Sequence, residues 1–214
     1  MTMTLRLTLP GTWFEVPLRS ENVSDRLREF ARELLGAEDR FASRRALLHQ
    51  RLLHAAERAR RGKAEQLHVG VALTEDVPLP GTISVYPSVA VSATRSVDAK
   101  TVIDTFIPSV IRAETDPVGG DPVPGADDRI FEVGERRILR RPRIRFDPDP
   151  DIPPGMLIDY WLTVPGTNRV QLVHVSIPEA LHTTLYATLF DEIVFASKPA
   201  GGATLRSELL LPDS

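Results

Sequence analysis

The stretch "MLIDYWLTVPGTNRVQLVHVSI", residues 156–177, decides the fold. Two runs rich in branched aliphatic and aromatic residues flank the tetrapeptide "PGTN". Runs of this kind are typical of strands, and a proline followed by a glycine is typical of a turn. The stretch therefore predicts a β-hairpin, and it favours a sheet that is mostly antiparallel.

An arginine-rich strand is predicted before the hairpin, in "GERRILRRPRIRF", residues 134–146. Side chains alternate between the two faces of a strand. We expect one face to point toward solvent with a row of four arginines, Arg137, Arg141, Arg143 and Arg145. The other face is largely apolar and is expected to meet the core, with Ile138, Arg140, Pro142, Ile144 and Phe146. Because a central strand tolerates proline poorly, Pro142 predicts an edge strand or a bulged strand.

Two interpretations of the arginine row stay open. In the first, the row binds phosphate, nucleic acid or an acidic partner, since the guanidinium fork fits phosphates and carboxylates. In the second, the row is paired with nearby carboxylates across the sheet, as opposite charges commonly are. The candidates for that pairing are Asp127, Asp128, Glu132 and Glu135. No aromatic residue alternates with these arginines, which disfavours stacking on nucleic-acid bases, so we favour the paired interpretation.

Helical periodicity dominates two other regions. Residues 24–62 predict two helices that meet near "GAEDR", with Gly62 ending the second. A last helix is predicted from Pro178 onward, with one apolar stripe that we expect to pack on the sheet: Leu181, Leu185, Leu189 and Ile193. Asp191 is expected on the solvent-exposed side of that helix. Between these regions, residues 67–93 predict strands broken at Pro78, Pro80 and Pro87.

Together these elements predict the α+β class, with a mostly antiparallel, twisted sheet flanked by helices. We expect a single domain over residues 1–200 and a C-terminal tail over residues 201–214. The formal net charge of −3 provides no overall attraction to nucleic acid. The first residues lack a basic segment followed by an apolar run, and no window is apolar enough to cross a membrane. We therefore expect a cytoplasmic protein without membrane insertion.

Catalytic and metal motifs are sparse. The chain has no cysteine, which excludes thiol nucleophiles and cysteine-ligated metals. Its five histidines include no HExxH pair. The acidic run "DPDPD" at residues 147–151 lacks the glycine and the final glutamate of a calcium loop, so we expect a loop there. We expect no metal and no cofactor, and we keep open an enzyme without a cofactor that uses His174 and Asp159.

Several segments resemble the PsbP-like superfamily, which includes the bacterial DcrB-type proteins. The hairpin around "VPGTN", the run "VQLVHVSIP" and the helix end "LFDEIVFASK" are similar to its C-terminal part, and "PGTWFEVPL" and "EVGERRILR" are similar to earlier segments. The matching positions are Ser176, Pro178, Phe190, Asp191, Ile193 and Ser197. The helical stretch over residues 24–62 is larger than the superfamily core requires.

The resemblance implies an α/β/α sandwich in which helices cover both faces of an antiparallel sheet. It also implies binding to other proteins, and it carries over no catalytic residue. We therefore expect a non-enzymatic adaptor or accessory protein whose protein partner is unknown, with the arginine helix and the arginine strand as candidate surfaces. An anion or nucleic-acid binder that uses the arginine strand is the first alternative, although the net negative charge makes nucleic acid a disfavoured partner.

Overall fold

A nine-stranded antiparallel sheet forms the centre of the computed structural model, which describes residues 4–113, 121–122, 127–146, 154–179 and 182–200. Its main path runs through β2 (Thr12–Glu15), β3 (Gln66–Thr74), β4 (Val77–Val85), β10 (Arg169–Ile177), β9 (Gly155–Val164), β8 (Arg136–Arg145) and β6 (Asp121–Pro122). Two further strands lie off this path, β5 (Val89–Ala90) beside β10 and β7 (Arg129–Val133) beside β8. A separate two-stranded sheet pairs β1 (Thr4–Arg6) with β11 (Lys198–Ala200).

The predicted hairpin is confirmed as β9 and β10. The two strands pair without a register shift from Val164 opposite Arg169 to Met156 opposite Ile177. Gly166 occupies the turn with φ of 69°, a left-handed backbone that glycine adopts without strain. Along both strands, buried side chains alternate with half-buried ones over most of the length. One face of the hairpin is therefore sealed and the other is partly open.

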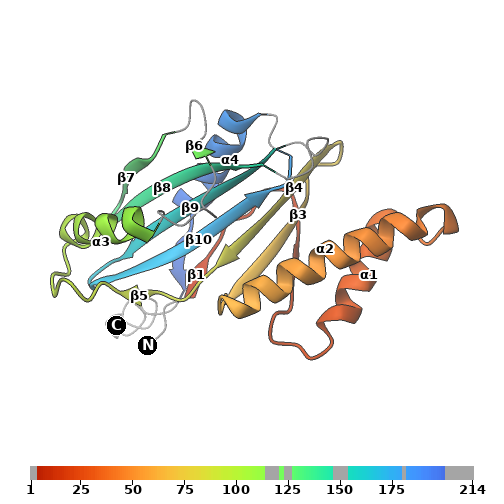
Figure 1. Ribbon diagram of the computed structural model, residues 1–214, viewed down its shortest axis with the longest axis horizontal. Helices are drawn as coiled ribbons and strands as arrows, with labels where there is room; N and C mark the ends of the chain where they lie inside the picture. Colours follow the sequence, from red (N-terminus) through yellow and green to blue (C-terminus); the bar gives the residue numbers. More distant parts are fainter. Residues whose placement is uncertain (1–3, 114–120, 123–126, 147–153, 180–181, 201–214) are drawn as a thin grey trace, which may run out of the picture.

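The sealed face packs against α4 (Thr183–Phe195) and the small sheet of β1 and β11. Figure 1 shows α4 behind the sheet, on the side away from the other helices. The core there joins Ile83, Ile158 and Val175 of the sheet to Phe190 and Ile193 of the helix. This core fixes the position of α4.

The predicted contact stripe of the last helix is wrong at Leu185, which is 66% exposed, whereas Ile193 is buried as expected and Leu189 is half-buried against the core. Leu181 lies outside the described residues. The other buried residues of the helix are Ala187, Phe190, Asp191 and Val194. Pro178 also precedes the helix, which begins at Thr183. The segment is apolar on more than one side, so its periodicity left two adjacent stripes to choose from.

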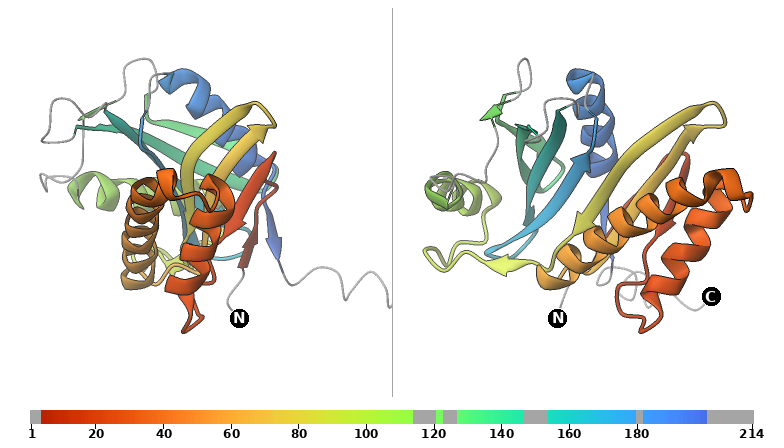
Figure 2. Two further views of the ribbon diagram at one scale, coloured as in Figure 1. Left: turned by 90° about the vertical axis from the view of Figure 1, so that its right-hand side faces the viewer. Right: turned by 45° about the vertical axis from the view of Figure 1, so that its right-hand side comes forward.

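Three helices cover the opposite face in two groups. α1 (Val23–Leu35) and α2 (Ala42–Arg61) pack on Leu67 and Val69 of β3, and a short 3-10 turn, η1 (Asp39–Phe41), connects them. α3 (Ala99–Ala113) packs on Leu139 of β8 and Val170 of β10. Figure 1 and the right view of Figure 2 show β10 and β9 between the two groups. The middle of this face therefore lacks a covering helix.

The expectation that Pro78 and Pro80 break the strand is wrong for β4. It runs unbroken through Pro78 and Pro80. Its pairing with β10 extends only from Thr82 to Val85, so the prolines occupy the part of β4 outside that pairing. The β3–β4 register also shifts near Pro78. The missing N–H groups are tolerated because that part of β4 needs fewer ladder bonds.

The α+β class with a mostly antiparallel sheet and helices on both faces is confirmed. Two helices over residues 24–62 are confirmed as well, with Gly62 at the end of α2. Within the described residues, no helix is long and apolar enough to cross a membrane. The predicted loop at residues 147–151 and the predicted tail at residues 201–214 lie outside the described residues.

Candidate functional site

The arginine strand is β8, and its four predicted arginines differ in exposure. Arg141 is buried at 5% exposure, and Arg137 and Arg143 are half-buried. Only Arg145 of the four is fully exposed. The prediction of a solvent-facing row is therefore wrong for Arg141, because this face of β8 lies at the edge of the α3 core around Leu139.

Carboxylates meet the arginines of this row. Asp128 accepts hydrogen bonds from Arg141 Nε at 3.0 Å and from Arg143 Nη1 at 2.8 Å. Arg137 pairs with Glu132 of the adjacent strand β7. Burial alone would raise the pKa of Asp128, but its bonds to Arg143 and Arg141 and their charges hold that pKa below its ordinary value. The predicted pairing is confirmed for Asp128 and Glu132, so part of the charge of the row is balanced within the protein.

Strand β8 is not a free edge. It pairs with β9 along one side, and β7 and β6 cover its other side. Pro142 lies between the residues that pair with β7, which end at Arg140, and those that pair with β6, which begin at Arg143. The missing N–H of the proline therefore coincides with the gap between two short edge strands.

A buried ion pair on the sealed face was missed by sequence reasoning. Arg140 Nη1 donates to Asp191 Oδ2 of α4 at 2.6 Å, and the Tyr160 hydroxyl donates to Asp191 Oδ1 at 2.9 Å. Asp191 is 8% exposed, so its expected place on the wet side of the helix is wrong. Burial raises the pKa of Asp191, while the bonds to Tyr160 and Arg140 oppose that rise. The sequence did contain a signal for this pair, because Arg140 is an arginine on the otherwise apolar face of its strand and needs a buried carboxylate there.

The arginines of helix α2 differ from those of β8 in their partners, because none of them is paired with a carboxylate among the described residues. Two of its six arginines hold the chain in place: Arg45 donates to the carbonyls of Gly36 and Glu38, and Arg60 donates to those of Leu18 and Ser20. The other four are exposed, Arg44, Arg51, Arg58 and Arg61. Among the described residues, none of these four forms an ion pair.

These four arginines share one side of α2. Arg44, Arg51 and Arg58 are seven residues apart, and Arg61 follows three later, so they lie along one stripe. We call Arg44, Arg51, Arg58 and Arg61 the α2 arginine face. Leu47, three residues after Arg44, is 50% exposed beside it. Glu57 is the only acidic residue of the helix, which therefore carries a local excess of positive charge in a chain of net charge −3.

A polar row crosses the uncovered middle of the helical face. Ser84 of β4 lies opposite His174 of β10, His174 lies opposite Asp159 of β9, and Asp159 lies opposite Arg141 of β8. His174 Nδ1 and Asp159 Oδ1 are 2.7 Å apart, and their side chains are 29% and 40% exposed. The structure therefore brings together the two residues that were considered for an enzyme.

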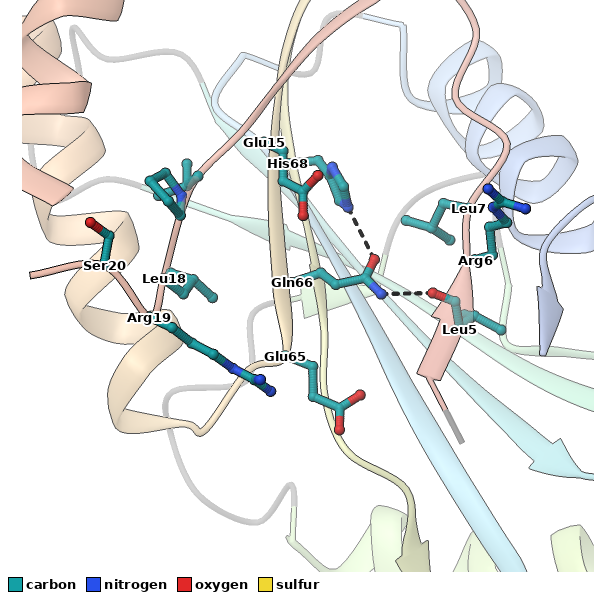
Figure 3. Close-up of a pocket in the computed structure, with 12 residues that line it drawn as sticks. Leu5, Arg6, Leu7, Glu15, Leu18, Arg19, Ser20, Glu65, Gln66 and His68 are labelled. Atoms are coloured by element: carbon teal, nitrogen blue, oxygen red, sulfur yellow. Dashed lines mark hydrogen bonds between the residues drawn. The ribbon is translucent and has the colours of Figure 1, made fainter. Parts of the chain in front are cut away.

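The pocket in Figure 3 lies between β1, the segment from Glu15 to Ser20, and the start of β3, with a cavity volume of about 620 Å³. Gln66 spans it: its amide nitrogen donates to the Leu5 carbonyl at 2.7 Å, and its amide oxygen accepts from His68 Nε2 at 3.1 Å. Burial lowers the pKa of His68, although the charge of Glu15 opposes this. Gln66 and a neutral His68 thus join the small sheet to the large one, which indicates a structural role.

Comparisons with known proteins found no match. No family model, no curated protein and no solved structure matches the chain. The resemblance to the PsbP-like superfamily therefore stays a prediction. Among the described residues, no group of three or more histidine, aspartate or glutamate side chains is placed to hold a metal ion.

Proposed function

We propose that the chain is an accessory protein that binds an acidic segment of a partner protein through the α2 arginine face. The observation that carries this proposal is the presence of four exposed arginines on one helix side, without an ion pair among the described residues. The arginine strand supports it less, since Arg141 and Arg143 already bind Asp128.

The geometry of the α2 arginine face suits an elongated ligand. Arg44 and Arg61 are 17 positions apart, which corresponds to roughly 25 Å of helix at about 1.5 Å per residue. Guanidinium groups bind carboxylates through two parallel hydrogen bonds, so each arginine can hold one acidic side chain. An acidic segment at least as long as this helix could contact all four.

A protein partner fits this surface better than nucleic acid. Leu47 adds exposed apolar area beside the arginines, and protein interfaces combine apolar contact with arginine. The helix α2 includes no phenylalanine, tyrosine or tryptophan on which a base could stack. The net negative charge of the chain also repels a long polyanion outside the local face.

The test is a direct binding measurement with two probes, a fluorescent peptide of glutamate and leucine residues and a single-stranded oligonucleotide of equal charge. We expect the peptide to bind, and its affinity to fall when Arg44, Arg51 and Arg58 are changed to glutamate. The matched control is a triple change of Arg26, Arg28 and Arg40, which are exposed and already paired with carboxylates.

Three outcomes distinguish the interpretations. Equal loss in both triple variants would show binding to general positive charge and would contradict a specific face. Tighter binding of the oligonucleotide, with affinity falling steeply between about 50 and 200 mM salt, would favour nucleic acid. A partner retained from a lysate of the source cells by the wild type, and lost by the α2 variant alone, would identify the natural ligand.

A further inference from the structure

The polar row across the uncovered sheet face contains a carboxylate–imidazole pair at Asp159 and His174. The pair is formed between directly opposed residues of a hairpin without a register shift, so its geometry is held by the backbone of two strands. Both side chains remain accessible, at 40% and 29% exposed. A ligand can therefore reach the imidazole without any movement of the fold.

The contact with Asp159 determines where the imidazole carries its proton. An ionised carboxylate only accepts hydrogen bonds, so Nδ1 of His174 must be the donor at 2.7 Å. In the neutral ring, Nε2 then holds the lone pair. Among the described residues, Nε2 of His174 makes no hydrogen bond. The ring is thus oriented at one nitrogen and available as a proton acceptor at the other.

The surroundings of the pair supply further polar groups. Ser84 flanks His174 on the side opposite Asp159, and Tyr86 follows Ser84 two residues later. Burial raises the pKa of Tyr86, and the charge of Asp159 adds to that rise while Ser84 and the charge of Arg58 oppose it. Beyond Asp159 lies Arg141, which is bound to Asp128. Asp159 is therefore the charged group directly opposite His174, Arg141 lies beyond Asp159, and Arg58 of α2 acts on Tyr86.

Apolar contact is present beside the pair. Leu157 and Leu172 lie on the same face of β9 and β10 as Asp159 and His174, and both are half-buried. Their register partners are Ser176 and Trp161, which are half-buried as well. A small ligand on this face would meet Leu172 and Trp161 on one side of the imidazole and Leu157 on the other.

We propose that Asp159 and His174 form a general-base site on the uncovered sheet face, which accepts a proton from the O–H group of water or of a small hydroxyl-bearing ligand. His174 Nε2 takes the proton as the oxygen attacks an electrophilic carbonyl. Asp159 is a positioning residue that holds the ring and stabilises the imidazolium. With an ester, the new C–O bond forms, the ester C–O bond breaks, and the alcohol leaves with the electron pair and is protonated by the imidazolium or by solvent.

An ordinary cross-strand ion pair is the competing explanation. Exposed pairs of this kind contribute little to stability. Both explanations place the proton on Nδ1, so the tautomer tests the geometry that the proposal needs, and the reactivity of the ring separates the two explanations without knowledge of a natural substrate.

The first measurement is the tautomer of His174, from the ¹⁵N chemical shifts of its ring nitrogens in the full chain at a pH where it is neutral. We expect the proton on Nδ1 in the wild type and a shift toward Nε2 in Asp159→Asn. A proton on Nε2 in the wild type would overturn the proposal, because the nitrogen meant to accept a proton would already carry one.

The second measurement is the hydrolysis of p-nitrophenyl acetate between pH 5 and 9. A positioned general base typically raises a reaction rate by about 10²–10⁴-fold. We therefore expect His174→Asn to lower the rate above background by a factor of about ten or more. Asp159→Asn is expected to lower the rate, because the ring is then no longer held with its proton on Nδ1. The control is His54→Asn, an exposed histidine on α2. Equal rates in the wild type, His174→Asn and His54→Asn would refute the general-base site.

These tests change residues outside the α2 arginine face. His174 and Asp159 lie on β10 and β9, and none of the four arginines on α2 takes part in the pair. Thermal melting of both variants checks that the sheet is intact. A variant that melts at the wild-type temperature and loses activity supports the proposal, whereas a folded variant with full activity contradicts it.

Discussion

Strand β8 and helix α2 each carry six arginines, and the protein uses the two sets differently. On β8, Arg137, Arg140, Arg141 and Arg143 all bind carboxylates, which come from β7, α4 and the segment before β7. On α2, two arginines bind backbone carbonyls and four point into solvent. Local abundance of arginine therefore says little about binding until the neighbours are known.

The difference follows from geometry. A strand inside a sheet has neighbours on both sides, and each register position brings another side chain within reach. The exposed side of a helix meets only residues three or four positions away on the same helix. Around Arg44, Arg51 and Arg58 those positions hold no acidic residue, and Glu57, four residues before Arg61, forms no ion pair among the described residues. Carboxylates therefore balance the arginine charge within the sheet, whereas the arginine charge on the helix stays available to a binding partner.

The largest expected effect comes from breaking the buried pair on β8. Arg140→Ala would leave Asp191 buried without its cation, and such losses cost about 3–5 kcal/mol of unfolding free energy. Urea unfolding at pH 7 measures it. Arg145→Ala, at the exposed end of the same strand, is the control and should change stability by less than about 0.5 kcal/mol. A loss below about 1 kcal/mol for Arg140→Ala would show that water reaches Asp191.

A smaller loss is expected for Tyr160→Phe. The change removes the hydroxyl that donates to Asp191 at 2.9 Å, and hydrogen bonds to charged groups contribute about 1.5–3 kcal/mol. Because that bond lowers the pKa of Asp191, the variant should also raise this pKa further, which a titration by NMR would detect. Tyr186→Phe, on α4 but outside the pair, serves as the control. An unchanged Asp191 titration would argue that the hydroxyl does not bind the charged form.

Asp128→Asn should cost about 1 kcal/mol near neutral pH, since its carboxylate is partly exposed and screened by solvent. The folded-state pKa of Asp128 lies below its ordinary value, so its contribution is present above that ordinary value of about 4 and is lost as pH falls through the folded-state pKa. Unfolding free energies of both proteins at pH 7 and pH 3 should therefore converge at low pH. A constant difference would exclude an ionic origin.

The smallest effect on stability is expected on the helix. Changing Arg44, Arg51, Arg58 and Arg61 together to glutamine should alter unfolding free energy by less than about 0.5 kcal/mol per site, because exposed residues without partners rarely matter more. Removal of like charges could give a slight gain at low salt. The same urea assay measures it. A loss above about 2 kcal/mol in total would reveal contacts that hold the helix in place and would weaken the contrast with β8.

Much of the fold could be predicted because its strongest signals are local. The hairpin of β9 and β10 and the pair of helices α1 and α2 follow from period-two and helical patterns with turn residues between them. The hairpin register even implies that Asp159 faces His174, once the turn is placed between Val164 and Arg169. That step from turn to register was the available route to the candidate general-base site.

The rest depended on contacts between distant parts of the chain. Arg140 and Asp191 are 51 positions apart, and nothing local indicates that α4 delivers a carboxylate to the sheet. The buried side of α4 was ambiguous because Leu185 and Phe190 lie on neighbouring apolar stripes, and only the shape of the sheet selects between them. Burial of Arg141 likewise requires knowing where α3 packs, and its sequence is compatible with more than one position.

The separation of the hydrophobic cores has a consequence for motion. The core under α1 and α2 includes Leu67 and Val69 of β3, and it shares no buried residue with the core beneath α4. Segments that rest on their own small core open as cooperative units before the whole molecule unfolds. Amide hydrogens of α1 and α2 are therefore expected to exchange with solvent faster than those of β9 and β10. Occupation of the α2 arginine face would then slow exchange in these two helices and leave the central strands unchanged.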